Sequence, residues 1–175
     1  MPQEKRPCKV TSLICDALCT LIEENKSYET LSLQEIVDRA GVCRNSFYRN
    51  YRSKEDIFKE KFREICEESN HLLAGKSDLT LYEIVYSIAV VMERNRRFLL
   101  CFYQASPKLY FDTLILQIEK SNTPKPISSV SPEEYYLFSS RAWITIGVLT
   151  EWLQKGCDIP AEKIASLLQS WVAKN

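Results

Sequence analysis

Apolar residues recur at every third or fourth position along most of this 175-residue chain, which predicts amphipathic α-helices over nearly its whole length. The stripe is clearest in residues 8–25, where leucine, isoleucine, valine and alanine return with the helical period. Further stripes predict helices over about residues 54–71, 80–94, 98–105, 107–118, 132–155 and 160–171. A stretch rich in serine and proline, residues 121–131, indicates the one clear loop. The predicted fold class is therefore all-α, with about nine helices.

Residues 32–54 depart from this pattern, because they contain two short helix signals separated by a tight turn. Ser32 and Glu35 have the spacing of a capping box, in which a hydroxyl and a carboxylate satisfy the first amides of a helix. Gly41 marks the end of that helix, since glycine adopts the left-handed conformation of a helix end at little cost. A second helix signal begins at Cys43. Two helices joined in this way form a helix-turn-helix, whose second helix can lie in the major groove of DNA.

The charge of this segment favours a nucleic-acid partner. Between Ala40 and Lys54 there is no acidic residue, and four residues are basic: Arg44, Arg49, Arg52 and Lys54. Phe47 and Tyr51 are four positions apart and are expected to face inward, which leaves an outer face of Arg44, Asn45, Tyr48 and Arg49. A solvated basic helix packed on a helical bundle accounts for the same spacing, so this pattern alone leaves both interpretations open.

The run AGVCRNSFYRNYRSKEDIF, residues 40–58, resembles the DNA-binding signature of the TetR/AcrR family of bacterial transcription regulators. The matching features are Gly41-Val42, Phe47-Tyr48, Tyr51 and Ser53-Lys54-Glu55. The resemblance is specific over about residues 10–60 and is architectural beyond them. Three positions depart from the commonest pattern without removing the motif: Cys43 in place of Ser or Thr, Asn45 in place of a small residue, and Arg52 in place of Pro.

The resemblance implies a ligand-responsive, DNA-binding transcriptional regulator, with repression favoured over activation, that binds a palindromic operator in double-stranded DNA as a homodimer. It implies a helix-turn-helix domain in residues 1–54 and a helical effector-binding and dimerisation domain in residues 55–175, linked by a helix from about 54 to 71. Carried over position by position, it implies contacts to base edges from Gln34, Arg44, Asn45 and Arg49. It implies contacts to phosphates from Ser32, Ser46, Tyr48 and Lys54.

The resemblance also implies an unknown small-molecule effector, bound among the middle helices. The aromatic residues available to line such a pocket are Tyr86, Phe98, Phe102, Tyr103, Tyr110, Phe111 and Trp143, although side chains of this kind more often belong to a core. The helix over 132–155 is apolar on two sides and so needs two partners, one of which is expected to be a second subunit. The predicted dimer face consists of Ile146, Leu149, Trp152, Leu153, Ile164, Leu168 and Trp171. The alternative is a monomer in which all three tryptophans are internal.

Composition argues against several other classes of protein. Basic and acidic residues are equal at 23 each, so net charge gives no sign of nucleic-acid binding and the local basic cluster is the better evidence. Four glycines, the single histidine His71 and the lack of a nucleophile, metal or phosphate-loop motif argue against an enzyme. The seven cysteines form no C-x-x-C pair, so neither a metal nor a cofactor is expected. Cys15 and Cys19 are predicted to be small core residues.

The first ten residues are polar, and the longest uncharged apolar-rich stretch, Phe98–Pro107, is too short to span a bilayer. The protein is therefore expected to be cytoplasmic. A TetR-like coregulator that acts through a protein partner rather than operator DNA is the alternative function. The basic residues between Arg44 and Lys54 argue against it, because a chain that had lost DNA binding would be free to lose them.

Overall fold

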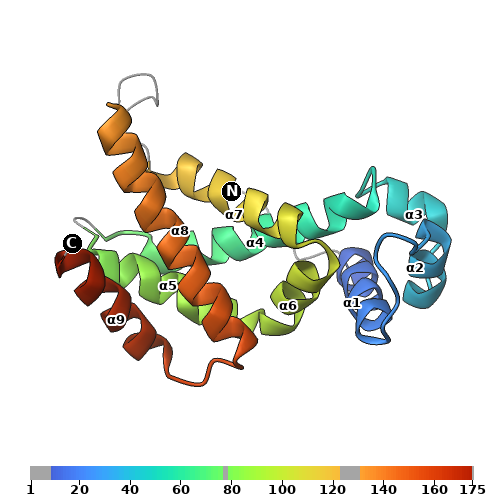
Figure 1. Ribbon diagram of the computed structural model, residues 1–175. Helices are drawn as coiled ribbons and strands as arrows, with labels where there is room; N and C mark the ends of the chain where they lie inside the picture. Colours follow the sequence, from blue (N-terminus) through green and yellow to red (C-terminus); the bar gives the residue numbers. More distant parts are fainter. Residues whose placement is uncertain (1–8, 77–78, 123–130, 175) are drawn as a thin grey trace. The chain divides into compact units, whose positions relative to one another are not determined.

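The computed structural model describes residues 9–76, 79–122 and 131–174, and within these ranges it consists of nine α-helices and no strand (Figure 1). The helices are α1 Lys9–Glu23, α2 Leu33–Ala40, α3 Arg44–Tyr48, α4 Lys54–Leu73, α5 Leu81–Arg94, α6 Arg96–Ala105, α7 Pro107–Asn122, α8 Pro132–Gln154 and α9 Ala161–Lys174. The all-α prediction is confirmed. None of the described helices has both the length and the hydropathy that crossing a membrane requires.

The chain forms two compact units, and each is assembled from separate stretches of sequence. The first unit comprises Met1–Glu64 and Arg97–Pro107, and the second comprises Ile65–Arg96 and Lys108–Asn175. The N-terminal half of α4 therefore belongs to the first unit and its C-terminal half to the second, while α6 returns to the first unit after the chain has passed through α5. The sequence predicted a boundary at residue 54 between a DNA-binding domain and an effector-binding domain. The two compact units do not test that division by function, so it stays a prediction.

Helices α1, α2 and α3 pack together around a small apolar core in the first unit. Helix α1 contacts both α2 and α3. Ile14 and Leu18 from α1, Ile36 from α2 and Phe47 from α3 are all fully buried. The stripe predicted for residues 8–25 is thus the inner face of α1, and its burial holds the two short helices of the helix-turn-helix in place.

Aromatic side chains make α6 part of the same unit. Phe58 of α4 stacks on Phe102 of α6, with ring centroids 4.5 Å apart and an interplanar angle of 6°. Phe98 of α6 lies 5.9 Å from Phe58, and Phe62 of α4 lies 6.3 Å from Phe102. Burying one such ring stabilises a fold by about 1.5–3 kcal/mol, so this cluster is a substantial part of the core.

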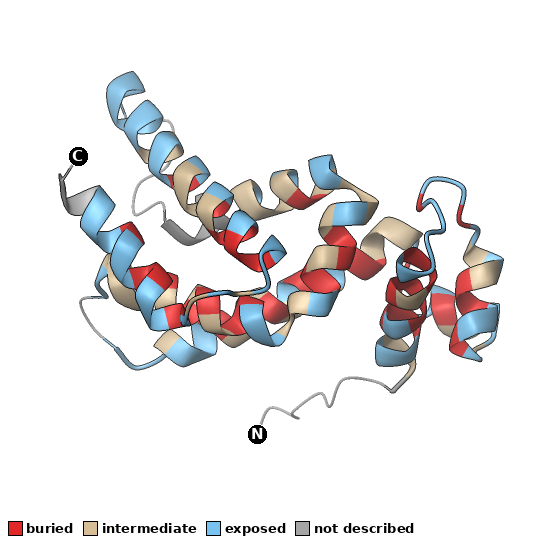
Figure 2. Ribbon diagram, turned by 60° about the horizontal axis from the view of Figure 1, so that its bottom comes forward, coloured by how far each residue is buried: buried red, intermediate tan, exposed pale blue. Residues whose placement is uncertain are grey.

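The second unit is packed on α5. This helix lies against α9 along its length and also contacts α8. Helix α7 contributes Tyr110, which is fully buried and whose hydroxyl lies 3.3 Å from the hydroxyl of Thr150 in α8. In Figure 2 the first turns of α8 are almost entirely exposed, whereas its C-terminal half carries most of its buried residues. Helix α8 is therefore anchored within the unit by its C-terminal half.

Polar side chains fix where three of the helices begin. Ser32, Thr80 and Ser131 precede α2, α5 and α8, and each accepts a hydrogen bond from the backbone N–H three residues later. That third residue is a glutamate in all three helices, and its carboxylate accepts from the N–H of the capping residue. In α2 this residue is Glu35, whose pKa is lowered to about 2, mainly by the Lys26 ammonium at 2.7 Å. The capping box predicted at Ser32 is confirmed.

Gly41 ends α2 with a φ of +64°, and a Cβ added there would meet no atom within 4 Å. Any cost of a side chain at this position therefore comes from the left-handed backbone and not from a clash.

We predict that Gly41→Ala lowers the free energy of unfolding by about 1 kcal/mol, measured by urea denaturation followed by circular dichroism. Gly41→Asn is the control and should lose less, because asparagine tolerates this conformation better; a larger loss for the asparagine variant would contradict the assignment.

Candidate nucleic-acid interface

Phe47 attaches α3 to the first unit. Its side chain is 0% exposed, and its ring centroid lies 5.4 Å from that of Tyr51 and 5.5 Å from that of Tyr48. Helix α3 has only five residues, far fewer than an isolated helix needs for stability in water. The burial of Phe47 therefore determines both that α3 forms and which of its faces points outward.

The outward face of α3 presents Arg44, Asn45 and Arg49, which are all exposed. Within the part of the chain that the structure describes, neither guanidinium has a hydrogen bond or an ion pair. Other arginines of the first unit are paired with glutamates, namely Arg39, Arg63 and Arg97. Two exposed cations without a partner among the described residues are suited to a polyanion such as DNA.

Two further predicted contact residues lie at the start of α2 and already have partners in the chain. Gln34 is exposed, but its Nε2 donates to a carboxylate oxygen of Asp38 at 2.7 Å. The Ser32 hydroxyl accepts from the N–H of Glu35 and donates to its carboxylate at 2.8 Å. A DNA contact by either side chain would therefore replace or share an existing hydrogen bond. Both contacts stay predictions.

Ser46 and Tyr48 flank this face of α3. Tyr48 is 56% exposed, whereas Ser46 is half-buried. The Ser46 hydroxyl lies 3.2 Å from the sulfur of Cys43, the residue that caps α3. This contact and the nearby amides lower the pKa of the Cys43 thiol. A sulfur atom thus occupies the place of the usual cap hydroxyl, and it makes no hydrogen bond to an amide that would cap the helix.

Lys54, which was predicted to contact a phosphate, also has partners within the chain. Its ammonium donates to the backbone oxygens of Tyr28 at 2.6 Å, Glu29 at 3.2 Å and Leu31 at 3.1 Å, and it lies 4.5 Å from the centroid of the Tyr28 ring. An ammonium group has three hydrogens to donate, and all three are engaged. The side chain of Lys54 thus holds the loop between α1 and α2. A phosphate contact would have to replace or share one of these bonds, and it stays a prediction.

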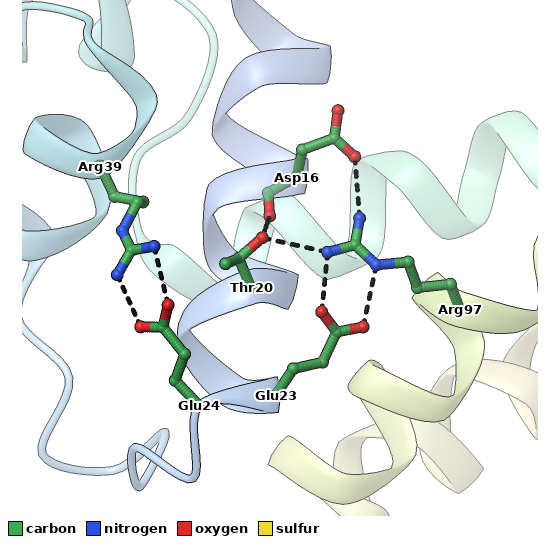
Figure 3. Close-up of polar contacts among 6 residues, drawn as sticks. All are labelled: Asp16, Thr20, Glu23, Glu24, Arg39 and Arg97. Atoms are coloured by element: carbon green, nitrogen blue, oxygen red, sulfur yellow. Dashed lines mark hydrogen bonds and ion pairs between the residues drawn. The ribbon is translucent and has the colours of Figure 1, made fainter.

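Two bidentate arginines brace the C-terminal end of α1 (Figure 3). Arg39 of α2 donates from Nη1 and Nη2 to the Glu24 carboxylate at 2.8 and 2.6 Å. Arg97 of α6 donates from Nε and Nη2 to the Glu23 carboxylate, both at 2.8 Å, and its hydrogen bond lowers the pKa of Glu23. Paired bonds of this kind fix orientation as well as distance. The sequence analysis did not predict a role for either arginine. The neighbouring Glu23 and Glu24 indicate that cations can bind there, but the sequence does not say which cations these are.

Three cysteines lie together inside the first unit. Cys15 and Cys19 of α1 and Cys101 of α6 are all buried, which confirms the prediction that the first two are core residues. The neighbouring thiols of Cys101 and Cys15 lower the pKa of Cys19. Interaction with Cys19 and burial raise the pKa of the other two thiols. Among the described residues, no group of histidine, cysteine, aspartate or glutamate side chains is arranged to hold a metal ion.

The side chains predicted to line a pocket are divided between the two units. The first unit contains Phe98, Phe102 and Tyr103, and the second contains Tyr86, Tyr110, Phe111 and Trp143. Phe98 and Phe102 belong to the aromatic cluster around Phe58. In the second unit, the Phe111 ring lies 6.1 Å from that of Trp143, while the Tyr86 hydroxyl donates to Glu162 at 3.3 Å. The pocket itself stays a prediction.

The predicted dimer face requires a correction. Six of its seven side chains are only 0–6% exposed in the single chain: Ile146, Leu149, Trp152, Leu153, Ile164 and Leu168. They form the core of the second unit and cannot present a surface to another subunit. The expectation that all three tryptophans are internal in a monomer is wrong, because Trp143 and Trp171 are exposed, while the choice between monomer and dimer stays a prediction. An apolar stripe on an amphipathic helix looks the same in the sequence whether it faces its own chain or a partner.

The new role of Lys54 leads to a prediction about stability. Lys54→Met removes the charged donor from three backbone oxygens and should lower the free energy of unfolding by about 1–3 kcal/mol, measured by urea denaturation. Arg49→Met is the matched control. It removes an exposed cation that has no partner among the described residues and should change stability by less than about 0.5 kcal/mol. If the two variants were equally stable, the bonds of Lys54 would have no structural weight.

Comparison with known proteins agrees with this geometry. A model of the family described as "Bacterial regulatory proteins, tetR family" matches residues 14–60, which contain most of α1, all of α2 and α3, and the start of α4. Among solved structures, a TetR transcriptional regulator from Streptococcus agalactiae is 20% identical with a TM-score of 0.64, over 94% of this chain and 93% of that chain.

Two further structures share the fold at lower similarity. The dihydroxyacetone kinase operon activator DhaS is 15% identical with a TM-score of 0.53, over 94% of each chain. The regulator FadR from Bacillus subtilis, solved in complex with stearoyl-CoA, is 16% identical with a TM-score of 0.51, over 91% of this chain and 95% of that chain. Such identities establish the fold alone, and the match of residues 14–60 establishes the family of the DNA-binding segment. The protein thus carries the DNA-binding segment of the TetR family of bacterial regulatory proteins, within a chain that has the fold of solved TetR-family regulators.

Proposed function

We propose that the protein binds a palindromic operator as a homodimer, that α3 of each subunit enters the major groove, and that a small-molecule effector in the second unit controls binding. The observation that carries the proposal is the pairing of a buried Phe47 with exposed, unengaged Arg44 and Arg49 on the opposite face of α3. A five-residue helix fixed in this way can enter a groove without first breaking bonds to its own chain.

The exposed side chains of α3 have the chemistry that reads bases. Arginine donates two parallel hydrogen bonds to guanine, and asparagine pairs with adenine in the same manner. Arg44 and Tyr48, and likewise Asn45 and Arg49, are four positions apart, so the four side chains share a band on one side of the helix. One helix of this length makes few base contacts, each worth about 1–3 kcal/mol of discrimination. A second copy of α3 is therefore needed for a specific operator.

An exposed stripe on α8 provides a surface for that second copy. It contains Tyr136, Ser140, Trp143 and Gly147, spaced four, three and four positions apart, and Trp143 is 50% exposed. Leu167 on the neighbouring helix α9 is 54% exposed. A Cβ added at Gly147 would meet no atom within 4 Å, so nothing within the described chain calls for glycine there. Glycine inside a helix costs about 1 kcal/mol relative to alanine, and the close approach of a partner helix would offset that cost.

Repression requires only that the bound dimer occupy the promoter, whereas activation requires a further surface that recruits the transcription machinery. We therefore propose repression, although one relative, DhaS, is named an operon activator. We propose a small-molecule effector because a protein with the same fold, the FadR of Bacillus subtilis, was solved in complex with stearoyl-CoA. Transcription in vitro from the operator-bearing promoter, with and without the protein, distinguishes repression from activation: a repressor lowers the amount of transcript, and an activator raises it.

The DNA contact is tested with a labelled fragment of the DNA upstream of the protein's own gene, titrated at two salt concentrations. Arg44→Ala and Arg49→Ala should each weaken binding about 10- to 100-fold and relax the preference for the operator over unrelated DNA, because each removes a base contact. Arg94→Ala, which removes an exposed arginine of the second unit, is the control and should bind as tightly as the wild type. A protein that binds no duplex, or whose affinity ignores salt, would exclude operator binding and favour a coregulator that acts through a protein partner.

The dimer is tested with Gly147→Leu. The single chain has open space at this position, so the variant should fold normally by circular dichroism, but analytical ultracentrifugation should give the mass of one chain where the wild type gives two. Arg141→Leu places the same side chain at an exposed position on another face of α8 and should remain dimeric. A dimeric Gly147→Leu protein would show that this stripe is not the interface.

A further inference from the structure

Arg96 and Arg97 stand where the chain passes from the second unit to the first, and each side chain is bonded within its own unit. Arg96 Nε donates to the backbone oxygen of Leu153, in the last turn of α8, at 3.2 Å. Arg97 donates to side chains of α1. The first turn of α6 is thus held at the point where the chain changes units.

Arg97 is hydrogen-bonded to three residues on one face of α1. Its Nε and Nη2 donate to Glu23 at 2.8 Å, Nη2 also donates to the Thr20 hydroxyl at 3.0 Å, and Nη1 donates to Asp16 at 3.4 Å (Figure 3). The three partners are spaced four and three positions apart, so they lie above one another on the helix surface. Contacts at three levels of one helix restrict both the rotation and the sliding of α1 against α6.

The same end of α1 continues this connection towards the helix-turn-helix. Glu24 is bonded to Arg39 of α2 through two hydrogen bonds, as Figure 3 shows beside the Arg97 site. Helix α2 in turn contacts α3, which carries the exposed arginines. Helix α6 is preceded and followed in the sequence by segments of the second unit, so the backbone connects it to that unit at both ends.

We propose that Arg97 is a positioning residue for DNA binding: it holds α1, and through α1 the helix-turn-helix, in the arrangement in which α3 reads DNA. This inference rests on the proposed function, because it assigns Arg97 a part in operator binding. The ion pairs of Arg97 are exposed, so they contribute little to global stability. Their loss should change how α1 is held more than whether the protein folds.

The test uses the full-length chain with Arg97→Met, and Arg94→Met as the control. Arg94 loses the same charge and a similarly exposed ion pair, with Glu68, but entirely inside the second unit. Affinity for the operator fragment is measured at a temperature where circular dichroism and tryptophan fluorescence show both variants to be folded. Arg97→Met should bind about 3- to 10-fold more weakly with an unchanged salt dependence, because Arg97 neutralises no phosphate. The double variant Arg97→Glu with Glu23→Arg should recover most of the affinity.

Hydrogen exchange of the free protein supplies the second readout. Amides in a peptide that covers residues 16–24 should exchange faster in Arg97→Met and at the wild-type rate in Arg94→Met. If the wild type bound no duplex DNA, the proposed function would fail and this inference with it. If the wild type bound and Arg97→Met bound equally well, only the role of Arg97 would be refuted. A reduced salt dependence in Arg97→Met would also overturn it, since Arg97 would then contact DNA directly.

Discussion

The burial of Phe47 is the interaction on which the proposed DNA-binding surface depends. A five-residue helix has no stability of its own, and the ring of Phe47 is the part of α3 that lies in the core with α1 and α2. Because a helix has a fixed geometry, burying that one side chain turns Arg44, Asn45 and Arg49 towards solvent. The apolar core therefore specifies which face of α3 carries the exposed cations.

Much of this surface could be predicted from the sequence, because the signals are local. The capping box of α2 needs only Ser32 and Glu35, and the end of that helix needs only Gly41, whose φ is +64° in the structure. The inner face of α1 follows from its period. The residues that resemble a TetR-family signature lie within a continuous stretch, and the family match covers the same stretch. Each of these features depends on residues only a few positions apart.

The features that the sequence did not reveal depend on contacts between distant residues. Phe98 and Phe102 looked like pocket residues of a second domain, but they complete the core beside Phe58. Lys54, predicted to contact a phosphate, also binds backbone oxygens of a loop more than twenty residues earlier, for which side-chain patterns give no signal. The DNA-binding unit is therefore completed by α6 from the middle of the chain, with Arg97 bonded to α1.

The most direct measurement of whether the exposed face of α3 reads DNA is dimethyl sulfate protection on the operator, because this reagent methylates guanine N7 in the major groove. Protection of guanines in two symmetric half-sites, one helical turn or a multiple of it apart, is the expected result for two copies of α3 in successive major grooves. Tight binding with every guanine N7 still reactive would show that the arginines of α3 do not enter the groove, and it would contradict the central claim.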